Sequence, residues 1–196
     1  MIGTYTPTPL KKVHYGPNSL ETQLLPSIRF LLAQAQNQAR NSGEGEDVKE
    51  EDVKGKVMII TGRSLMEKTP VIKDVEKVLM KAGFYGLTFS DIAQHARKPI
   101  MPLSSSLSYS SHRTDRFHSV WFAFLHMFYV AIKDIQRAKQ LALDNEIDLL
   151  LSIGGGSPID STKAISYFVR EAKGGKGAFL PHIAVPTTLS VAETTQ

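Results

Sequence analysis

The sequence predicts an α/β fold, a parallel β-sheet flanked by helices, and three observations support this prediction. Short apolar runs, which suit strands buried on both faces, alternate with helical patterns along most of the 196 residues. Glycines stand where several of these segments end, and one apolar run leads directly into three consecutive glycines. Such alternation builds right-handed βαβ units, so we expect one Rossmann-like domain over residues 1–196.

The expected elements follow one another in a regular order. Strands are predicted at residues 12–15, 57–61, 86–89, 148–153 and 182–185. Helices are predicted at residues 19–38, 71–82, 132–143 and 158–172. Pro26 is expected to kink or divide the first helix, and Gly83 to end the second.

The apolar spacing also assigns a core face to each predicted helix. For residues 71–82 this face consists of Val71, Val75, Val78 and Leu79. For residues 158–172 it consists of Ile165, Phe168 and Val169.

Two segments interrupt the alternation. Residues 41–55 carry an acidic run and are predicted to form an acidic surface loop. Residues 97–130 change abruptly from Ser- and Pro-rich to aromatic sequence and are longer than the usual loop of a compact domain. We interpret residues 97–130 as an atypical insertion that the working fold does not need. The alternative is a genuine insertion that packs its aromatic side chains on the domain surface.

The composition excludes several classes of protein. The chain is 42% hydrophobic and 21% charged, which is ordinary for a globular domain. Its Lys and Arg residues are scattered despite a net charge of +4, so we expect no nucleic-acid partner. The absence of cysteine excludes disulfides, thiolate catalysis and Cys-ligated zinc. None of the six histidines pairs with another at i,i+4, and each is expected to be structural or exposed.

The sequence carries no membrane or secretion signal. The longest apolar run covers residues 120–132, and a membrane-spanning helix needs roughly 20 residues. The N-terminus lacks the apolar core of a signal peptide. We therefore expect a cytoplasmic protein without a membrane partner, and a mitochondrial location is the alternative.

The most informative segment is the apolar run at residues 148–153, which continues into Gly154, Gly155 and Gly156 and then a helix. Glycines let the backbone approach an anion closely, and the N–H groups of a following helix point at that anion. Phosphate or pyrophosphate is the natural ligand. The segment lacks the third glycine of the Rossmann dinucleotide motif, where Ile159 stands, and its lysine does not follow a glycine as in a P-loop.

A simpler explanation of the same residues is helix capping. Ser157 can serve as the N-cap, with Asp160 three residues later completing a capping box. Capping does not require three glycines, and it is compatible with an anion at the same helix end.

These residues carry a resemblance to a known family. The segment GGGSPIDSTKAI, residues 154–165, closely resembles the signature of the iron-containing (group III) alcohol dehydrogenases, which share a fold with dehydroquinate synthase and glycerol dehydrogenase. Residues 14–20, 57–65 and 184–188 resemble three further segments of that family in the same order. The resemblance implies the family's N-terminal nucleotide-binding domain.

The resemblance implies hydride transfer between an alcohol or carbonyl carbon and NAD or NADP. Pyrophosphate would bind at the glycine turn and Ser157, Asp160 would lie near the nicotinamide, and a Thr pair would face the cofactor across the cleft. The implied cofactor-binding residues are Gly62, Ser64, Gly154, Gly155, Gly156, Ser157, Asp160, Thr187 and Thr188. For the two threonines, a plain turn at a strand end is the alternative. Because Gly62 and Arg63 put no acid at the end of the second strand, NADP is expected to bind at least as well as NAD.

The family polarises its substrate oxygen with a divalent metal, iron or zinc, held by residues of a following all-helical domain. The sequence ends at Gln196, so we expect that domain to be absent and this chain alone to be inactive, with no catalytic or metal-ligating residue assigned. The expected substrate is a small alcohol or aldehyde, and a homodimer is expected for the full-length family. The alternatives are a non-catalytic nucleotide-binding module and a relative of dehydroquinate synthase or glycerol dehydrogenase.

Overall fold

The structure is a computed structural model that describes residues 3–5, 11–40, 48–92, 132–175 and 177–188. Its centre is a four-stranded sheet in the order β4-β3-β5-β6. The strands are β3 (Val57–Gly62), β4 (Tyr85–Ile92), β5 (Leu149–Gly154) and β6 (His182–Pro186). All three pairings are parallel, and every residue of β3 and β5 is buried. The predicted parallel α/β fold is therefore confirmed.

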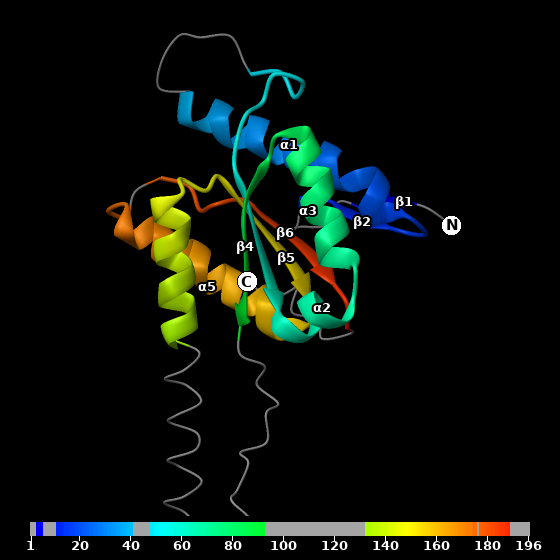
Figure 1. The fold of residues 1–196 in the computed structure, drawn as a ribbon. Helices are drawn as coiled ribbons and strands as arrows, with labels where there is room; N and C mark the ends of the chain where they lie inside the picture. The colour runs from blue at the N-terminus through cyan, green and yellow to red at the C-terminus, as the bar shows by residue number, and fades with distance from the viewer. Residues whose placement is uncertain (1–2, 6–10, 41–47, 93–131, 176, 189–196) are drawn as a thin grey trace, which may run out of the picture.

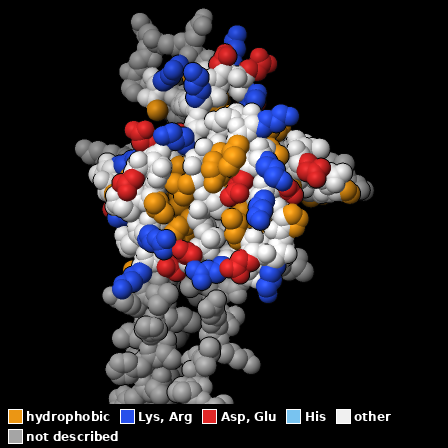
Figure 2. Space-filling view, viewed as in Figure 1, with side chains coloured by type: hydrophobic (Ala, Val, Ile, Leu, Met, Phe, Trp, Pro, Cys, Tyr) orange, Lys and Arg blue, Asp and Glu red, His pale blue; other side chains and the backbone are white. Residues whose placement is uncertain are grey.

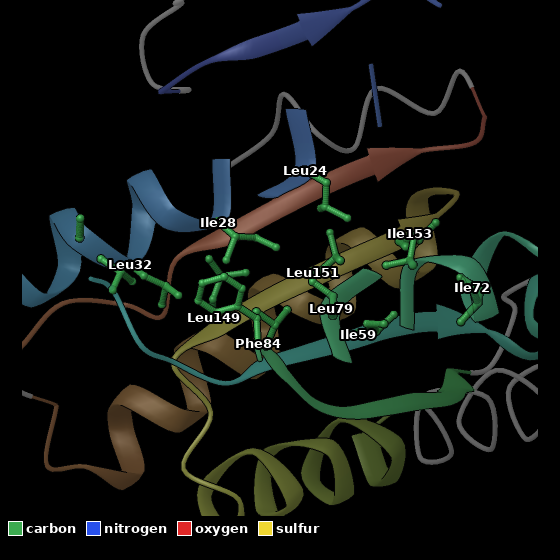
Figure 3. Packing of buried hydrophobic residues seen from close by; sticks show 14 residues of the cluster. Leu24, Ile28, Leu32, Ile59, Ile72, Leu79, Phe84, Leu149, Leu151 and Ile153 are labelled. Atoms are coloured by element: carbon green, nitrogen blue, oxygen red, sulfur yellow. The ribbon is translucent and has the colours of Figure 1, made fainter. Parts of the chain in front are cut away.

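Helices cover both faces of this sheet (Figure 1). On one face, α1 (Ser19–Arg40) and α3 (Val71–Ala82) share a hydrophobic core with the sheet. On the other face lie α5 (Gly156–Ala172) and a helix over residues 132–144. Figure 3 shows side chains of α1 pointing at β5, with Ile28 close to Leu149 and Leu24 above Leu151. Within the described ranges, no helix is long and apolar enough to cross a membrane.

Two of the predicted helical core faces are corrected by the structure. Val78 is 41% exposed and Phe168 is 37% exposed, although both were assigned to the core. In α3 the buried residues are Ile72, Val75 and Leu79, which recur at helical spacing and place Val78 at the rim of the stripe. In α5 the fully buried Ile159 belongs to the core. The space-filling view shows hydrophobic side chains in the middle of one face, bordered by charged groups (Figure 2).

The N-terminal region departs from prediction at two points. The predicted strand at residues 12–15 corresponds to β2 (Val13–Tyr15), which pairs antiparallel with an unforeseen strand, β1 (Gly3–Tyr5). The helix α1 runs through Pro26 without a break, so the expected division is wrong. Buried side chains of α1 on both sides of the proline pack on the sheet, which holds the helix together there.

The acidic segment is described from residue 48 onward. Its carboxylates at residues 50–52 are exposed, whereas Val53 is only 6% exposed and joins the core beneath α1. The backbone N–H of Val48 donates a hydrogen bond of 2.8 Å to Oδ1 of Asn37. This end of the segment is therefore attached to α1.

The atypical insertion, residues 97–130, lies outside the described residues. Its two flanks are close together, because Nη1 of Arg137 in the helix over 132–144 lies 2.9 Å from Oδ2 of Asp91 in β4. We therefore predict that deleting residues 97–130 leaves the melting temperature and solubility unchanged or higher. Thermal melts of the full and deleted chains, purified side by side, test this. A lower melting temperature or aggregation of the deleted chain would show that the segment supports the fold.

Candidate functional site

The carboxyl edge of the sheet contains a topological switch point between β3 and β5. From β3 the chain passes through α2 (Arg63–Lys68) and α3 to β4 on one side, and from β5 it passes through α5 to β6 on the other. Because α3 and α5 lie on opposite faces, the segments leaving β3 and β5 run to opposite sides of the sheet, and open α/β sheets bind ligands at such a point. Oγ1 of the buried Thr61 donates a hydrogen bond of 2.8 Å to the carbonyl of Ile153 and holds the two strands together there.

The glycine turn at the end of β5 requires residues without a Cβ. Gly154 has φ +151°, and a Cβ added there would lie 2.9 Å from Cγ of Pro158. A Cβ added to Gly155 would lie 3.0 Å from Oγ1 of Thr188. A side chain at either position would therefore fill the space between the turn and its neighbours.

The start of α5 corrects the capping explanation. The helix begins at Gly156, so its N-cap is Gly155, which makes no side-chain capping hydrogen bond. Ser157 is thus the second helical residue, and the predicted capping box is wrong. Asp160 is exposed, with its Oδ1 3.5 Å from Nζ of Lys163. Because no side chain caps α5, the backbone N–H groups of its first turn are available to donate hydrogen bonds to an anion or to water.

The Thr pair lies against the glycine turn. The N–H of Thr187 donates a hydrogen bond of 2.8 Å to the carbonyl of Gly154, and the side chain of Thr188 lies beside Gly155. Both threonines are exposed. The structure therefore contains the strand-end turn and leaves both threonine side chains accessible beside the glycine turn.

The end of β3 brings the remaining candidate residues to the same edge. Gly62 is buried and forms the N-cap of α2, and Ser64 is half-buried in the first turn of that helix. Since β3 lies next to β5, Gly62 and the glycine turn flank the switch point. The structure therefore gathers residues from positions 62 to 188 along one edge.

The sequence missed an acid at this edge. Oδ1 of Asp91, at the end of β4, lies 2.8 Å from Nη2 of Arg63, whereas the end of β3 itself carries no acid. Asp91 is register partner of Gly62 but follows it by 29 positions in the chain, and only strand pairing brings them together. The hydrogen bond from Arg63 holds the pKa of Asp91 below its ordinary value, against the opposing effect of burial.

A second unforeseen pair lies inside the sheet. Oγ of the fully buried Ser152 is 2.7 Å from Nε2 of His182, on the neighbouring strand β6. Burial, with a smaller contribution from the charge of Lys163, lowers the pKa of His182 to about 4. His182 is therefore a neutral packed side chain near pH 7, in agreement with the structural role predicted for it.

The gathered residues fit a dinucleotide but include no metal-ligand set. The turn without Cβ atoms and the uncapped start of α5 at the switch point suit a pyrophosphate. Among the described residues, no group of three or more His, Cys, Asp or Glu side chains could hold a metal ion. A shallow pocket lined by Lys56, Gly83 and Asp148, among others, lies at the opposite edge of the sheet and is separate from this site.

Comparisons with known proteins were made for sequence and for structure. The sequence model described as iron-containing alcohol dehydrogenase matches residues 129–196, which include the glycine turn and the Thr pair. This match confirms the resemblance that the glycine motif indicated. No curated protein matches the chain.

One of the similar solved structures supports the fold. A structure titled as an iron containing alcohol dehydrogenase aligns with TM-score 0.53 and 18% identity, over 96% of this chain and 38% of its own. An iron-containing alcohol dehydrogenase from Corynebacterium glutamicum aligns with TM-score 0.40 and 22% identity, over 85% of this chain and 28% of its own. The chain thus spans less than two fifths of the length of these structures.

Proposed function

We propose that this chain is the cofactor-binding portion of a metal-requiring alcohol dehydrogenase of the iron-containing family, and that it binds NAD(P) at the carboxyl edge of β3 and β5. The observation that carries the proposal is the convergence of three features at one switch point. These are the glycine turn, the uncapped start of α5 and the Thr pair. Each occurs alone in proteins that bind no nucleotide, but together they form a lined anion site.

The turn and helix would bind the pyrophosphate. Gly156 and Ser157 are the first two residues of α5, so their N–H groups point out of the start of the helix, where the helix dipole favours negative charge. The hydrogen bond between Thr187 and Gly154 fixes the opposite wall, so the site is organised before the ligand enters.

Hydride transfer itself is assigned to no residue of this chain. In the family, a divalent metal polarises the alcohol or carbonyl oxygen, and no residue of this sequence is assigned as its ligand. The proposal is that this chain orients the dinucleotide and does not by itself oxidise alcohols. An assay of the purified chain with simple alcohols and added iron or zinc tests that part.

Cofactor binding is tested by calorimetric titration of the full chain with NAD and NADP. We expect saturable binding of at least one of them, and we expect inorganic pyrophosphate to compete, because it occupies the same turn. Competition distinguishes this site from one that binds the adenine ring alone. Absence of binding of both dinucleotides to a folded chain would contradict the proposed function.

A further inference from the structure

A cluster of three charged side chains lies beside Gly62 at the carboxyl edge. Nη2 of Arg63, which begins α2, is 2.8 Å from Oδ1 of Asp91, and Nη1 of Arg137, from the helix over 132–144, is 2.9 Å from Oδ2. One carboxylate therefore links two guanidinium groups that come from different parts of the chain. The two arginine side chains are 57% and 64% exposed, whereas Asp91 is only 28% exposed.

We propose that Arg63 and Arg137, linked by Asp91, recognise the 2′-phosphate of an NADP-type dinucleotide. This inference rests on the proposed function, because it assigns the adenosine end of the same cofactor. It goes further in naming the class of dinucleotide and the residues that select it.

The position of the cluster fits the adenosine ribose. The glycine strand β5 has two neighbours, β3 and β6, and the switch point lies between β5 and β3, so we place the adenosine ribose at the end of β3. Gly62 contributes no side chain, so the groups present there come from Arg63 and from the end of β4. Adjacent strands are about 4.8 Å apart, which puts β4 about 10 Å from the glycine turn along the edge.

The chemistry of the cluster favours a phosphate over a ribose hydroxyl. A site that selects NAD offers a carboxylate with free acceptor sites to the 2′-hydroxyl. Both oxygens of Asp91 instead accept hydrogen bonds from arginines. Each guanidinium carries five N–H donors in a fixed fork that suits phosphate, and the bond to Asp91 is made by one terminal nitrogen of each.

Acidic groups near the cluster reduce its net positive charge. The hydrogen bond and charge of Asp91 raise the pKa of Arg63, and the charges of Glu67 and Asp134 add smaller contributions in the same direction. The attraction for a phosphate therefore depends on the directed donors of two guanidinium groups more than on net charge. Removing the carboxylate of Glu67 should strengthen binding of the 2′-phosphate.

A purely structural role for the cluster makes a different prediction. Asp91 and Arg137 stand on either side of residues 93–131, so their ion pair could simply hold the two flanks together. That role would affect stability but not the preference between two cofactors. The ratio of the dissociation constants of NAD and NADP is therefore the decisive measurement, because these ligands differ only in the 2′-phosphate.

The experiment titrates the full chain and its Arg63→Gln and Arg137→Gln variants with NAD and with NADP at one salt concentration. We expect tighter binding of NADP to the unmodified chain, and a preference reduced about tenfold or more in each variant, since hydrogen bonds to charged groups are strong. Arg170→Gln is the matched control, because Arg170 binds the carbonyl of Gly177 in another part of the domain and should leave the preference unchanged. Glu67→Gln should bind NADP more tightly and NAD equally well.

Equal affinity of the unmodified chain for both cofactors would overturn this inference and leave the proposed function intact. Failure to bind either cofactor would overturn both. An unchanged preference in folded Arg63→Gln and Arg137→Gln chains would assign the cluster to the structural role. If a glutamine variant does not fold, Arg63→Lys and Arg137→Lys retain the charge without the planar fork and should show a smaller loss of the same preference.

Discussion

Replacing Gly155 with valine is expected to weaken NAD(P) binding by about a hundredfold or more. A Cβ at this position would already lie 3.0 Å from Oγ1 of Thr188 and 3.4 Å from its Cγ2, and valine adds two methyl groups to that Cβ. The side chain would occupy the phosphate space of the turn and displace the N–H donors of α5. Losing about two charge-assisted hydrogen bonds corresponds to roughly 3 kcal/mol, hence the hundredfold estimate. Calorimetric titration with the preferred cofactor measures the change.

Gly83→Val is the control that separates binding from folding. Gly83 ends α3 in the left-handed conformation, with φ +77° and nothing within 4 Å of an added Cβ. Valine there should cost about 1–2 kcal/mol of stability through backbone strain, yet leave the distant carboxyl edge unchanged. We expect this variant to melt earlier and to bind normally. Unchanged affinity in a folded Gly155→Val chain would contradict the assignment of the turn.

The stability of the domain is expected to fall as the pH is lowered from about 6.5 toward 4. The ordinary pKa of histidine is near 6.5, but burial lowers the pKa of His182 to about 4 in the folded chain. Between these values the unfolded chain binds a proton that the folded chain excludes. The contribution of His182 is therefore complete above pH 6.5 and declines through this window, by up to about 3 kcal/mol.

Urea unfolding at pH 7, 6, 5 and 4.5 measures this effect. The informative comparison is His182→Gln, which keeps a polar group near Ser152 but cannot be protonated in this range. Carboxylates also titrate at the lower pH values, so the difference between the two chains is the quantity of interest. We expect the variant to lose markedly less stability than the unmodified chain. If the free energy of unfolding of the two chains depended on pH in the same way, His182 would have the same pKa in the folded and the unfolded chain.

Local sequence was sufficient to predict most of the helices and strands. The continuous apolar runs at β3 and β5 predicted fully buried strands, because only the interior of a sheet covered on both faces accommodates them. Gly83 predicted the end of α3 because glycine adopts the left-handed conformation at low cost. These signals act over a few residues, and tertiary packing did not override them.

Other predictions needed information that local sequence does not contain. Val78 and Phe168 are apolar and were assigned to the core, but they lie outside the buried stripes of α3 and α5 and are partly exposed. Pro26 removes one hydrogen bond of α1, yet the helix continues because its flanking residues are packed. The strand β1 is too short to be predicted without its pairing to β2.

The sequence by itself determined the α/β class and the position of the glycine turn between a strand and a helix, because the hydrophobic period and the glycines can be seen in consecutive residues. The tertiary structure alone decided which strand ends meet. The order β4-β3-β5-β6 puts the switch point between Gly62 and Gly154, sets Thr188 against Gly155 and joins Asp91 to two arginines. The physical reason is that strand pairing and helix packing depend on contacts between residues 28 to 92 positions apart, such as Arg63 with Asp91 and Thr61 with Ile153.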